Sequence, residues 1–310
     1  MLSTELFSPI QGANVAAHSE DARRLLSGPT AAGPLLVWLL DALQPMNRTR
    51  VKQLLRHGSI CVNGTVTTRH DHPLRPGDQV AIARAAADRS LAEAGIDIVL
   101  EDDALIVLDK PPGMLTVATD AEKTDTAFAR LSAHLTARGL GRPFVVHRLD
   151  RETSGLLLFA RSAVVRDLLQ SNWGEVKKTY LAVVEGKPQR DEGMVDNFLL
   201  EGRDLRVRAV RKGSAGRRAV THYRVLASHG RYSLLEVVLE TGRKHQIRVH
   251  LTGLGCPVIG DPLYGSASDP AGRLGLHAQR LSLDHPTSMR RLELEAPLPA
   301  VLRRVCMKLG

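Results

Sequence analysis

The stretch HRLDRETSGLLLFARS, residues 147–162, joins a charged segment to an apolar one. The run GLLLFA at 155–160 predicts a fully buried strand. Turn residues normally introduce such a strand, yet here a histidine and several charged residues precede it. These residues are His147, Arg148, Asp150, Arg151 and Glu152. The charged segment is therefore a candidate functional loop at the mouth of a core strand.

The composition is that of a globular protein with a basic surface. The chain has 310 residues, enough for two domains, and 43% of them are hydrophobic, which suffices for a packed core. Aromatic residues make up only 4%, which argues against recognition by a broad aromatic platform. The net charge of +9 favours a polyanionic partner such as a nucleic acid. The alternative is a protein that its charge merely keeps in solution.

The cysteines and apolar runs indicate a cytoplasmic protein. Cys61, Cys256 and Cys306 form no CxxC pair, which argues against a disulfide framework or a cysteine zinc site and suits a reducing compartment. The first residues lack the positive charge and apolar run of a secretory signal. The longest apolar run, LLVWLL at 35–40, is too short to span a membrane.

Periodicity divides the chain into four parts. Residues 1–32 have no clear period and are expected to form a disordered arm, and an Ala-rich linker is expected at 84–95. Between them, 33–83 forms a small domain of helices and short strands. From 96 to 310 short β runs dominate, with helical patterns near 124–138 and 162–173. The predicted fold class is α+β.

The small domain contains a basic helix. NRTRVKQLLRHGSICVNG at 47–64 predicts a helix, a short strand and a turn, and LRPGDQVAI at 74–82 closes the domain. This pattern resembles the S-four-like RNA-binding domain, which implies contact with RNA phosphates. A solvated helix face is the alternative. The expected RNA-binding residues, of which three are spaced by four, are Arg48, Arg50, Lys52 and Arg56.

The larger part resembles the RluA-type pseudouridine synthases. Besides HRLD, the matching segments in order are IVLEDDALIVLDKPPGM (98–114), KKTYLAVVEG (177–186), LETGRKHQIRVHLTGLGCPVIGDPLYG (239–265), LHAQRLSL (276–283) and EAPLP (295–299). The resemblance implies a mixed, mostly antiparallel catalytic domain with a central cleft. It also implies isomerisation of uridine to pseudouridine in structured RNA. Large-subunit ribosomal RNA is the expected substrate, with transfer RNA as the alternative.

The resemblance also implies three catalytic residues. Asp150 would attack the anomeric carbon or remove the 2′ proton. Arg248 would bind that carboxylate in a bidentate pair and keep it ionised. Tyr180 would stack on the target base, and its hydroxyl is a candidate for removing the proton from carbon five. Taken singly, a loop carboxylate, a strand tyrosine and an ion-paired arginine are each usually structural, so the prediction depends on the motifs occurring together.

Four further residues are expected at the substrate. Arg148 would fill the gap left by a flipped base or hold a phosphate, and His147 would brace the loop by hydrogen bonds. Lys110 and Arg243 are candidate phosphate contacts.

A second basic segment lies between Arg203 and Arg218, with seven cations and one acid. KGSAGRR at 212–218 predicts a hairpin tip. We expect Arg217 and Arg218 to contact the RNA backbone beside the active site, and a solvated loop is the alternative.

The sequence predicts neither a cofactor nor a metal. The isomerisation needs no redox chemistry, and the chain carries no dinucleotide or P-loop fingerprint. His245 and His250 fall on opposite faces of the strand expected there, which does not suit a metal. The protein is expected to act as a monomer on RNA. The rival classes are a non-catalytic RNA-binding or ribosome-assembly factor and a metal-dependent nuclease, which would want clustered carboxylates.

Overall fold

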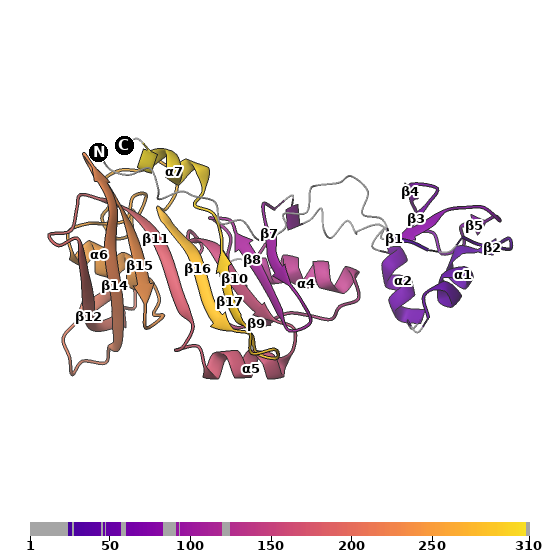
Figure 1. Ribbon diagram of the computed structural model, residues 1–310, viewed down its shortest axis with the longest axis horizontal. Helices are drawn as coiled ribbons and strands as arrows, with labels where there is room; N and C mark the ends of the chain where they lie inside the picture. Colours follow the sequence, from indigo (N-terminus) through magenta and orange to yellow (C-terminus); the bar gives the residue numbers. More distant parts are fainter. Residues whose placement is uncertain are drawn as a thin grey trace. The chain divides into compact units, whose positions relative to one another are not determined.

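The chain divides into two compact units, residues 1–86 and 87–310 (Figure 1). The computed structural model describes residues 24–26, 28–44, 46, 48–56, 60–82, 91–92, 94–119 and 125–307. Within these ranges the side chains at 24, 49, 50, 53, 56 and 307 are not described.

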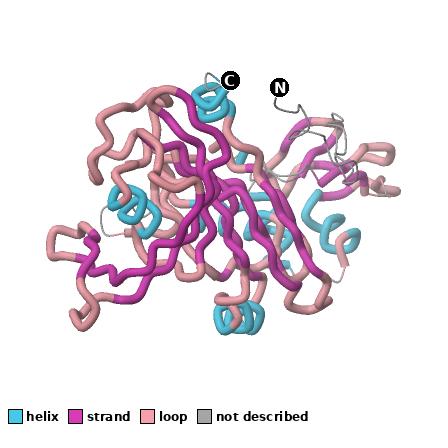
Figure 2. Tube along the Cα trace, turned by 60° about the vertical axis from the view of Figure 1, so that its left-hand side comes forward, coloured by secondary structure: helices cyan, strands magenta, loops and turns pink. Residues whose placement is uncertain are grey.

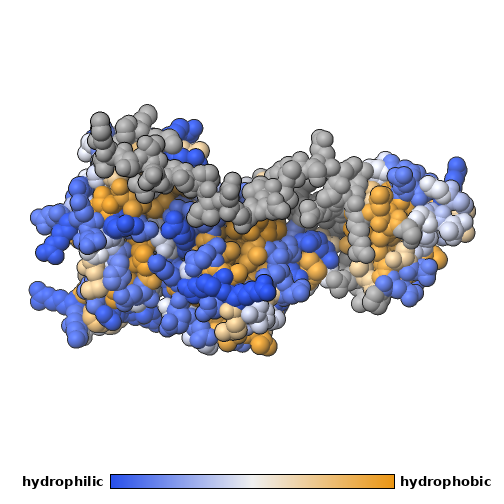
Figure 3. Space-filling view, viewed as in Figure 1, coloured by the Kyte–Doolittle hydropathy of each residue, from blue (hydrophilic) through white to orange (hydrophobic). Residues whose placement is uncertain are grey.

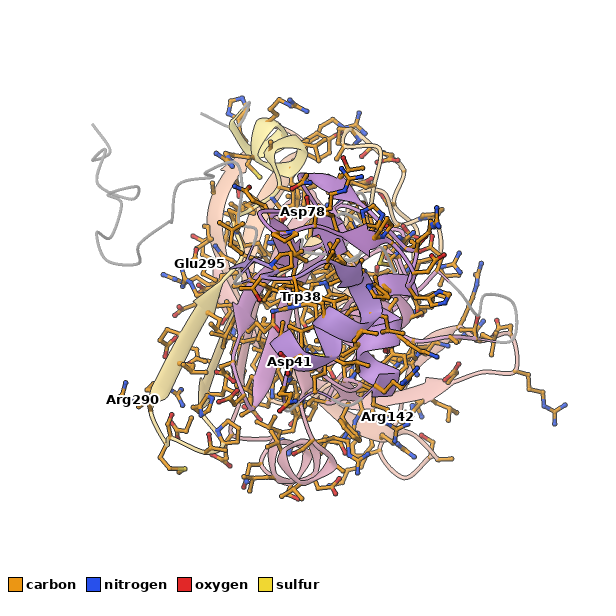
Figure 4. The ribbon with its side chains drawn as sticks, turned by 90° about the vertical axis from the view of Figure 1, so that its right-hand side faces the viewer. Trp38, Asp41, Asp78, Arg142, Arg290 and Glu295 are labelled. Carbon is orange, nitrogen blue, oxygen red and sulfur yellow. The ribbon has the colours of Figure 1, made fainter. Side chains whose placement is uncertain are left out.

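In the described part of the first unit there are two short helices, a four-stranded sheet and a separate two-stranded sheet. The helices are α1 (Leu35–Ala42) and α2 (Arg48–Arg56). The sheet has the order β1 (Arg24–Leu25), β6 (Val80–Ile82), β3 (Ile60–Val62), β4 (Thr65–Val66), and β2 (Gly33–Pro34) pairs with β5 (Pro73–Leu74). Leu35, Leu39 and Val51 are fully buried between helices and sheet, and Trp38 packs on this core (Figure 4).

A tight turn joins β3 to β4. Asn63 and Gly64 both have positive φ, 49° and 81°, as a two-residue hairpin turn requires. The Asn63 amide donates to Asp78 at 2.9 Å, and its oxygen accepts from the Gln79 N–H at 2.8 Å. Asp78 is labelled in Figure 4. The turn that the sequence predicts is therefore present and held by the Asp78 side chain and the Gln79 backbone N–H.

The boundaries differ in two places from the predicted ones. Within the arm expected at 1–32, Arg24–Leu25 form β1 and pair with β6, while residues 1–23 lie outside the described part. Within the linker expected at 84–95, Leu91 is 3% exposed and packs in the core of the second unit. Leu26 in the first segment packs on the core of the first unit, as Leu91 does in the second, and this apolar burial accounts for their packing, whereas Leu25 is 67% exposed.

A large, mostly antiparallel sheet forms the second unit. Its order is β13 (Val207–Val210), β12 (Glu192–Glu201), β14 (Arg217–His229), β15 (Tyr232–Leu239), β11 (Lys177–Glu185), β16 (Leu276–Asp284), β10 (Ser154–Ala160), β8 (Leu105–Lys110), β7 (Asp97–Glu101). β17 (Arg291–Glu295) pairs with β16, and β9 (Phe144–Val145) pairs with β10. Arg290 and Glu295 mark the two ends of β17 in Figure 4. The predicted α+β class is confirmed.

Helices lie around this sheet (Figure 2). They are α4 (Ala127–Ala137), α5 (Ala163–Ser171), α6 (Gln246–Gly253) and α7 (Ala300–Met307). Thr126 and Ser162 cap α4 and α5 by accepting from backbone N–H groups. Val164 on α5 is 78% exposed, and α5 lies where apolar residues gather at the lower edge of Figure 3. Among the described residues, no helix combines the length and apolarity needed to cross a membrane.

The strand that follows the charged loop lies at the centre of the sheet. In β10, Leu156 and Leu158 point into one apolar cluster, and Leu157 and Phe159 point into another. All four are 0% exposed, so the buried strand is as predicted. β10 runs parallel to β16, with Gly155 beside Ala278. Because it precedes β10, the charged loop emerges beside this junction.

Candidate active site

The loop from His147 to Thr153 is held at several points. The His147 ring accepts from the Leu158 N–H at 3.0 Å and stacks on Trp173 with ring centroids 4.6 Å apart. Burial lowers the pKa of His147 to about 3, so the ring stays neutral. The Thr116 hydroxyl both donates to the Leu149 carbonyl and accepts from its N–H, at 2.9 and 3.1 Å. The residue before Asp150 is therefore fixed from outside the loop.

Lys110 differs from its expected role as a phosphate contact. It is 0% exposed at the end of β8. Its Nζ donates to the carbonyls of Pro111, Met114 and Arg151, at 2.8, 2.9 and 3.1 Å. Because an ammonium group has three donors, none remains for a phosphate. Lys110 instead ties the first motif to the loop that carries Asp150.

Asp150 lies between a histidine and an arginine. Its side chain is 29% exposed, and its Oδ2 lies 3.8 Å from Arg248 Nη1 and 3.9 Å from His245 Nε2. Both distances exceed a direct hydrogen bond. The Asp150 carboxylate therefore faces positive and polar groups yet keeps its oxygens available.

Arg248 does pair with a carboxylate in a bidentate manner, but the partner is Asp261. Its Nε and Nη2 donate to the two Asp261 oxygens at 2.6 and 2.8 Å. Asp261 is fully buried, so this pair fixes the guanidinium in a dry environment. Burial opposes the charge on Arg248, but the bonds to Asp261 outweigh it and raise the pKa. The bidentate pair that was predicted between Arg248 and Asp150 is therefore not formed. Only the remaining Nη1 of Arg248 faces Asp150.

Tyr180 lies on β11 at a break in the register. The pairing of β11 with β16 shifts between Thr179 and Tyr180, where Tyr180 comes opposite Ala278. Burial, followed by the nearby charge of Asp150, raises the pKa of Tyr180. The phenol therefore stays protonated near neutral pH.

One cleft brings these side chains together. Its volume is about 940 Å³. Both the loop 147–153 and the segment 242–248 line it, so two distant motifs meet there. The predicted site residues on its walls are Asp150, Tyr180, Arg248, Arg148, His147 and Arg243.

Known proteins share both the sequence and the fold. A family model described as RNA pseudouridylate synthase matches residues 104–252. YlyB, an uncharacterized RNA pseudouridine synthase of Bacillus subtilis, is 37% identical over 265 residues, 82% of this chain and 86% of that protein. The ribosomal large subunit pseudouridine synthase D of Neisseria meningitidis serogroup A is 35% identical over 292 residues, 87% of this chain and 76% of that protein. The chain belongs to the RNA pseudouridine synthase family.

A solved structure agrees with this assignment. Human RNA pseudouridylate synthase domain containing 4 matches with a TM-score of 0.61 at 26% identity, covering 72% of this chain and 96% of that one. The RluA-type resemblance and the enzyme class that the motifs predict are confirmed. The enzyme is thus an isomerase that acts on RNA.

The segment HQIRVH in the synthase is helical, contrary to the strand expected there. α6 begins after His245, and residues 246–251 are all buried, so burial shows no helical period along it. His245 Nδ1 lies 2.8 Å from the Tyr264 hydroxyl, whereas His250 bonds to Thr221 and Asn197. The two histidines have separate partners, and because they flank or lie on a helix, the opposite strand faces expected for them do not exist.

The basic segment 203–218 is not a hairpin. β13 and β14 both pair with β12, on opposite sides of it, so KGSAGRR links strands that are not neighbours. Arg217 and Arg218 lie on β14 itself, and Arg218 forms an ion pair with Asp196 at 2.6 Å. Neither arginine is among the residues that line the cleft. The cations of the segment are exposed, whereas Val207 is buried, and Figure 3 shows a hydrophilic surface at this end of the second unit.

The remaining residues predicted to contact RNA lie in two places, at the cleft of the second unit and on α2 of the first. Arg148 is exposed at the cleft and has no hydrogen-bond or ion-pair partner among the described residues. Arg243 lies at the cleft, and its Nε donates to the Arg218 carbonyl at 3.1 Å. In the first unit, Arg48 and Lys52 on α2 are exposed. The side chains of Arg50 and Arg56 lie outside the described part.

Sequence reasoning missed the contacts of three residues around Asp150 and Arg248: His245, Asp261 and Tyr264. The centroid of the Tyr264 ring lies 4.9 Å from the guanidinium carbon of Arg248, and the Tyr264 backbone N–H donates to Asp261. All three belong to the third motif, within KHQIR and GDPLYG. An acid thirteen residues after a buried arginine was the available signal, but only the fold shows that they meet.

Proposed function

We propose that the protein converts uridine to pseudouridine in large-subunit ribosomal RNA, acting in the cytoplasm as a monomer. Relatives from Neisseria, Zymomonas and Xanthomonas are named ribosomal large subunit pseudouridine synthase D, which supports this RNA class. The net charge of +9 and the exposed cations on α2 suit a polyanionic substrate. In this proposal the first unit is an S-four-like domain that delivers RNA, with 1–32 as an arm and 84–95 as the connection.

Asp150 is the proposed catalytic carboxylate. The observation that carries this assignment is its position in the cleft, 3.8 Å from a guanidinium that Asp261 already holds. Arg248 then places a positive charge beside Asp150 without occupying both of its oxygens. A carboxylate so placed can serve as nucleophile or base.

The proposed reaction balances within the nucleotide. The bond between C1′ and N1 of uridine breaks, the base turns, and a bond forms between C1′ and C5. The C5 proton leaves, and N1 ends protonated. Asp150 either attacks C1′ to form an ester that the returning base displaces, or takes the 2′ proton and later returns it.

Tyr180 in this scheme stacks on the base. Its raised pKa keeps the phenol neutral, and a neutral phenol is a weak base for the C5 proton. Its ring is therefore the more important part. Arg148, exposed and unpaired within the described residues, is the proposed group that fills the gap left by the flipped base. His147 holds the loop 147–153 against β10 through its bond to the Leu158 N–H.

Tritium release tests the proposal. RNA labelled at C5 of uridine would be prepared as unmodified large-subunit ribosomal RNA and as unmodified transfer RNA, and each incubated with protein and chelator. We expect release from ribosomal RNA only. Release from transfer RNA alone would change the substrate class, and tight binding to both without release would identify a non-catalytic RNA-binding factor.

A further inference from the structure

A chain of hydrogen bonds reaches the catalytic cleft from the sheet edge. The Val207 N–H on β13 donates to the Tyr264 hydroxyl at 3.0 Å. The same hydroxyl lies 2.8 Å from His245 Nδ1. At the other side of the imidazole, Nε2 faces Asp150 Oδ2 at 3.9 Å. The order is therefore backbone N–H, phenol, imidazole and carboxylate.

The first bond sets the direction of the others. A backbone N–H can only donate, so it occupies a lone pair of the Tyr264 oxygen and leaves the hydroxyl proton free to point elsewhere. Nδ1 lies 2.8 Å away and is an acceptor that this proton can reach. A neutral imidazole that accepts at Nδ1 carries its own proton on Nε2. The proton on Nε2 thus points toward Asp150.

The backbone holds His245 firmly in this place. Its φ of 54° lies in the left-handed region, which a histidine adopts only when its surroundings over-determine it. His245 precedes α6, and its side chain is 13% exposed. The Gln246 side chain accepts from the Arg243 N–H at 3.0 Å and so fixes the turn 243–246, which contains His245. No protein acceptor for Nε2–H lies within hydrogen-bonding distance in the described part of the chain.

We propose that His245 is a positioning residue whose neutral ring, with its tautomer fixed by Tyr264, donates from Nε2 to Asp150 when RNA closes the cleft. This inference rests on the proposed role of Asp150. Distances of this kind are commonly long without substrate and shorten in the complex. The bond would hold one Asp150 oxygen so that the other faces the ribose.

The charges around His245 are consistent with a neutral ring. Burial lowers the pKa of His245, the negative charge of Asp150 opposes this, and the cations Arg248 and Lys244 reinforce it. Asp261 also faces the ring, but Arg248 neutralises it. A neutral donor orients Asp150 without forming a full ion pair that would weaken it as a nucleophile or base.

The tautomer can be read directly, without any assay of activity. Nitrogen NMR of histidine-labelled protein, with His245→Asn used to assign the signal, distinguishes protonated Nε2 from protonated Nδ1. We expect the Nε2–H form in the natural protein and a mixture of forms in Tyr264→Phe. The Nδ1–H form in the natural protein would overturn the inference. This result does not depend on Asp150 being catalytic.

Kinetics provide the second test. His245→Asn keeps a residue that tolerates the left-handed backbone and should lower kcat about 100-fold, the effect of losing a positioned group. Tyr264→Phe removes only the hydroxyl and should lower kcat about 3- to 10-fold, the value of one hydrogen bond. RNA affinity should not change in either. His229→Asn and Tyr232→Phe, which lie outside the cleft, are the matched controls.

The pH profile separates positioning from a structural role. Without the Tyr264 hydroxyl, the neutral form loses its hydrogen bond at Nδ1 while burial and the cations Arg248 and Lys244 remain, so the pKa of His245 should rise part of the way toward its ordinary value. Tyr264→Phe should then lose more activity near pH 6 than near pH 8. An equal loss at all pH values would contradict the inference. If Asp150→Asn stays active, the proposed catalytic role of Asp150 fails instead, whatever the tautomer of His245.

Discussion

At the scale of residues, the site depends on an ion pair that never meets the substrate in our scheme. The Arg248 side chain is 9% exposed and that of Asp261 is 0% exposed, with two hydrogen bonds between them. Such a pair contributes little net stability against an apolar replacement, but losing one partner leaves a buried charge. Arg248 therefore needs Asp261 in order to remain beside Asp150.

Asp261→Asn should lower the free energy of unfolding by about 3–5 kcal/mol, because the Arg248 charge loses its only ionised hydrogen-bond partner among the described residues. Denaturant unfolding measures this. The matched control is Asp196→Asn, which breaks the exposed pair with Arg218 and should change stability little. An Asp261→Asn protein as stable as the control would show that the buried pair is not required.

At the scale of elements, the short parallel pairing of β10 with β16 sets the position of the loop 147–153. β10 and β16 run parallel for two residue pairs, Ser154 with His277 and Gly155 with Ala278. Gly155 has φ of 109°, and a Cβ there would lie 2.2 Å from the Ala278 carbonyl oxygen. Ser154 also bonds His277 and Arg273, at 2.8 and 2.6 Å. The two strands therefore approach each other closely and share polar contacts immediately after the loop that carries Asp150.

Gly155→Ala should destabilise the protein by at least about 3 kcal/mol, since it adds both backbone strain and a clash with backbone atoms. Gly174→Ala serves as the control, because a Cβ at that turn meets nothing within 4 Å. Thermal unfolding of the two variants gives the comparison. Equal melting temperatures would mean that the strands can separate at low cost.

The two arginines that begin β14 are the element-scale candidates for RNA contact. We expect the double variant Arg217→Ala and Arg218→Ala to weaken RNA binding and to flatten its salt dependence by about 0.7–0.9 in log–log slope per lost phosphate contact. Affinity measured across a salt series tests this. Arg190→Ala with Arg231→Ala removes two exposed charges elsewhere and is the control. An unchanged slope would exclude this strand from the RNA interface.

At the scale of the whole molecule, three histidines couple stability to pH. Burial lowers the pKa of His147 to about 3 and those of His250 and His277 to about 4. In the unfolded chain all three bind protons below about pH 6.5. The unfolded chain therefore binds more protons between these values, and stability falls as pH drops through that window.

We expect the free energy of unfolding to decrease between pH 6.5 and about pH 4, with little change between pH 6.5 and 8 from these groups. His250→Asn should reduce this acid slope by the contribution of one proton. Urea unfolding at a series of pH values measures both. A slope that is the same in the variant would show that His250 takes up its proton in the folded state.

The sequence predicted the class of the fold and the members of the cleft better than their contacts. The apolar run of β10 and the alternating strands indicate a sheet without ambiguity, and motif order placed Asp150, Tyr180 and Arg248 together. By contrast, α6 is buried on every side from 246 to 251, so its sequence carries no helical period. With the helix unrecognised, neither the pairing of Arg248 with Asp261 nor that of His245 with Tyr264 was predictable.

Lys110 illustrates the same limit. A lysine beside two prolines and a glycine suggests a cation in a loop, open to phosphate. Three backbone carbonyls surround it instead, two from the residues that follow it, Pro111 and Met114, and one from Arg151, which lies far along the chain. Contacts between segments far apart in sequence were thus the part that only the fold could supply.

The most direct test of the central claim is the single-turnover rate of pseudouridine formation by the natural protein and by Asp150→Asn on the same RNA. Protein would be held in excess over RNA so that both variants are fully bound. Glu152→Gln, a neighbouring exposed carboxylate of the same loop, is the control. We predict that Asp150→Asn binds RNA as tightly but reacts at least about 10²–10⁴-fold more slowly, while Glu152→Gln stays within about tenfold of the natural rate. A natural rate from Asp150→Asn would contradict the assignment of Asp150 as the catalytic carboxylate.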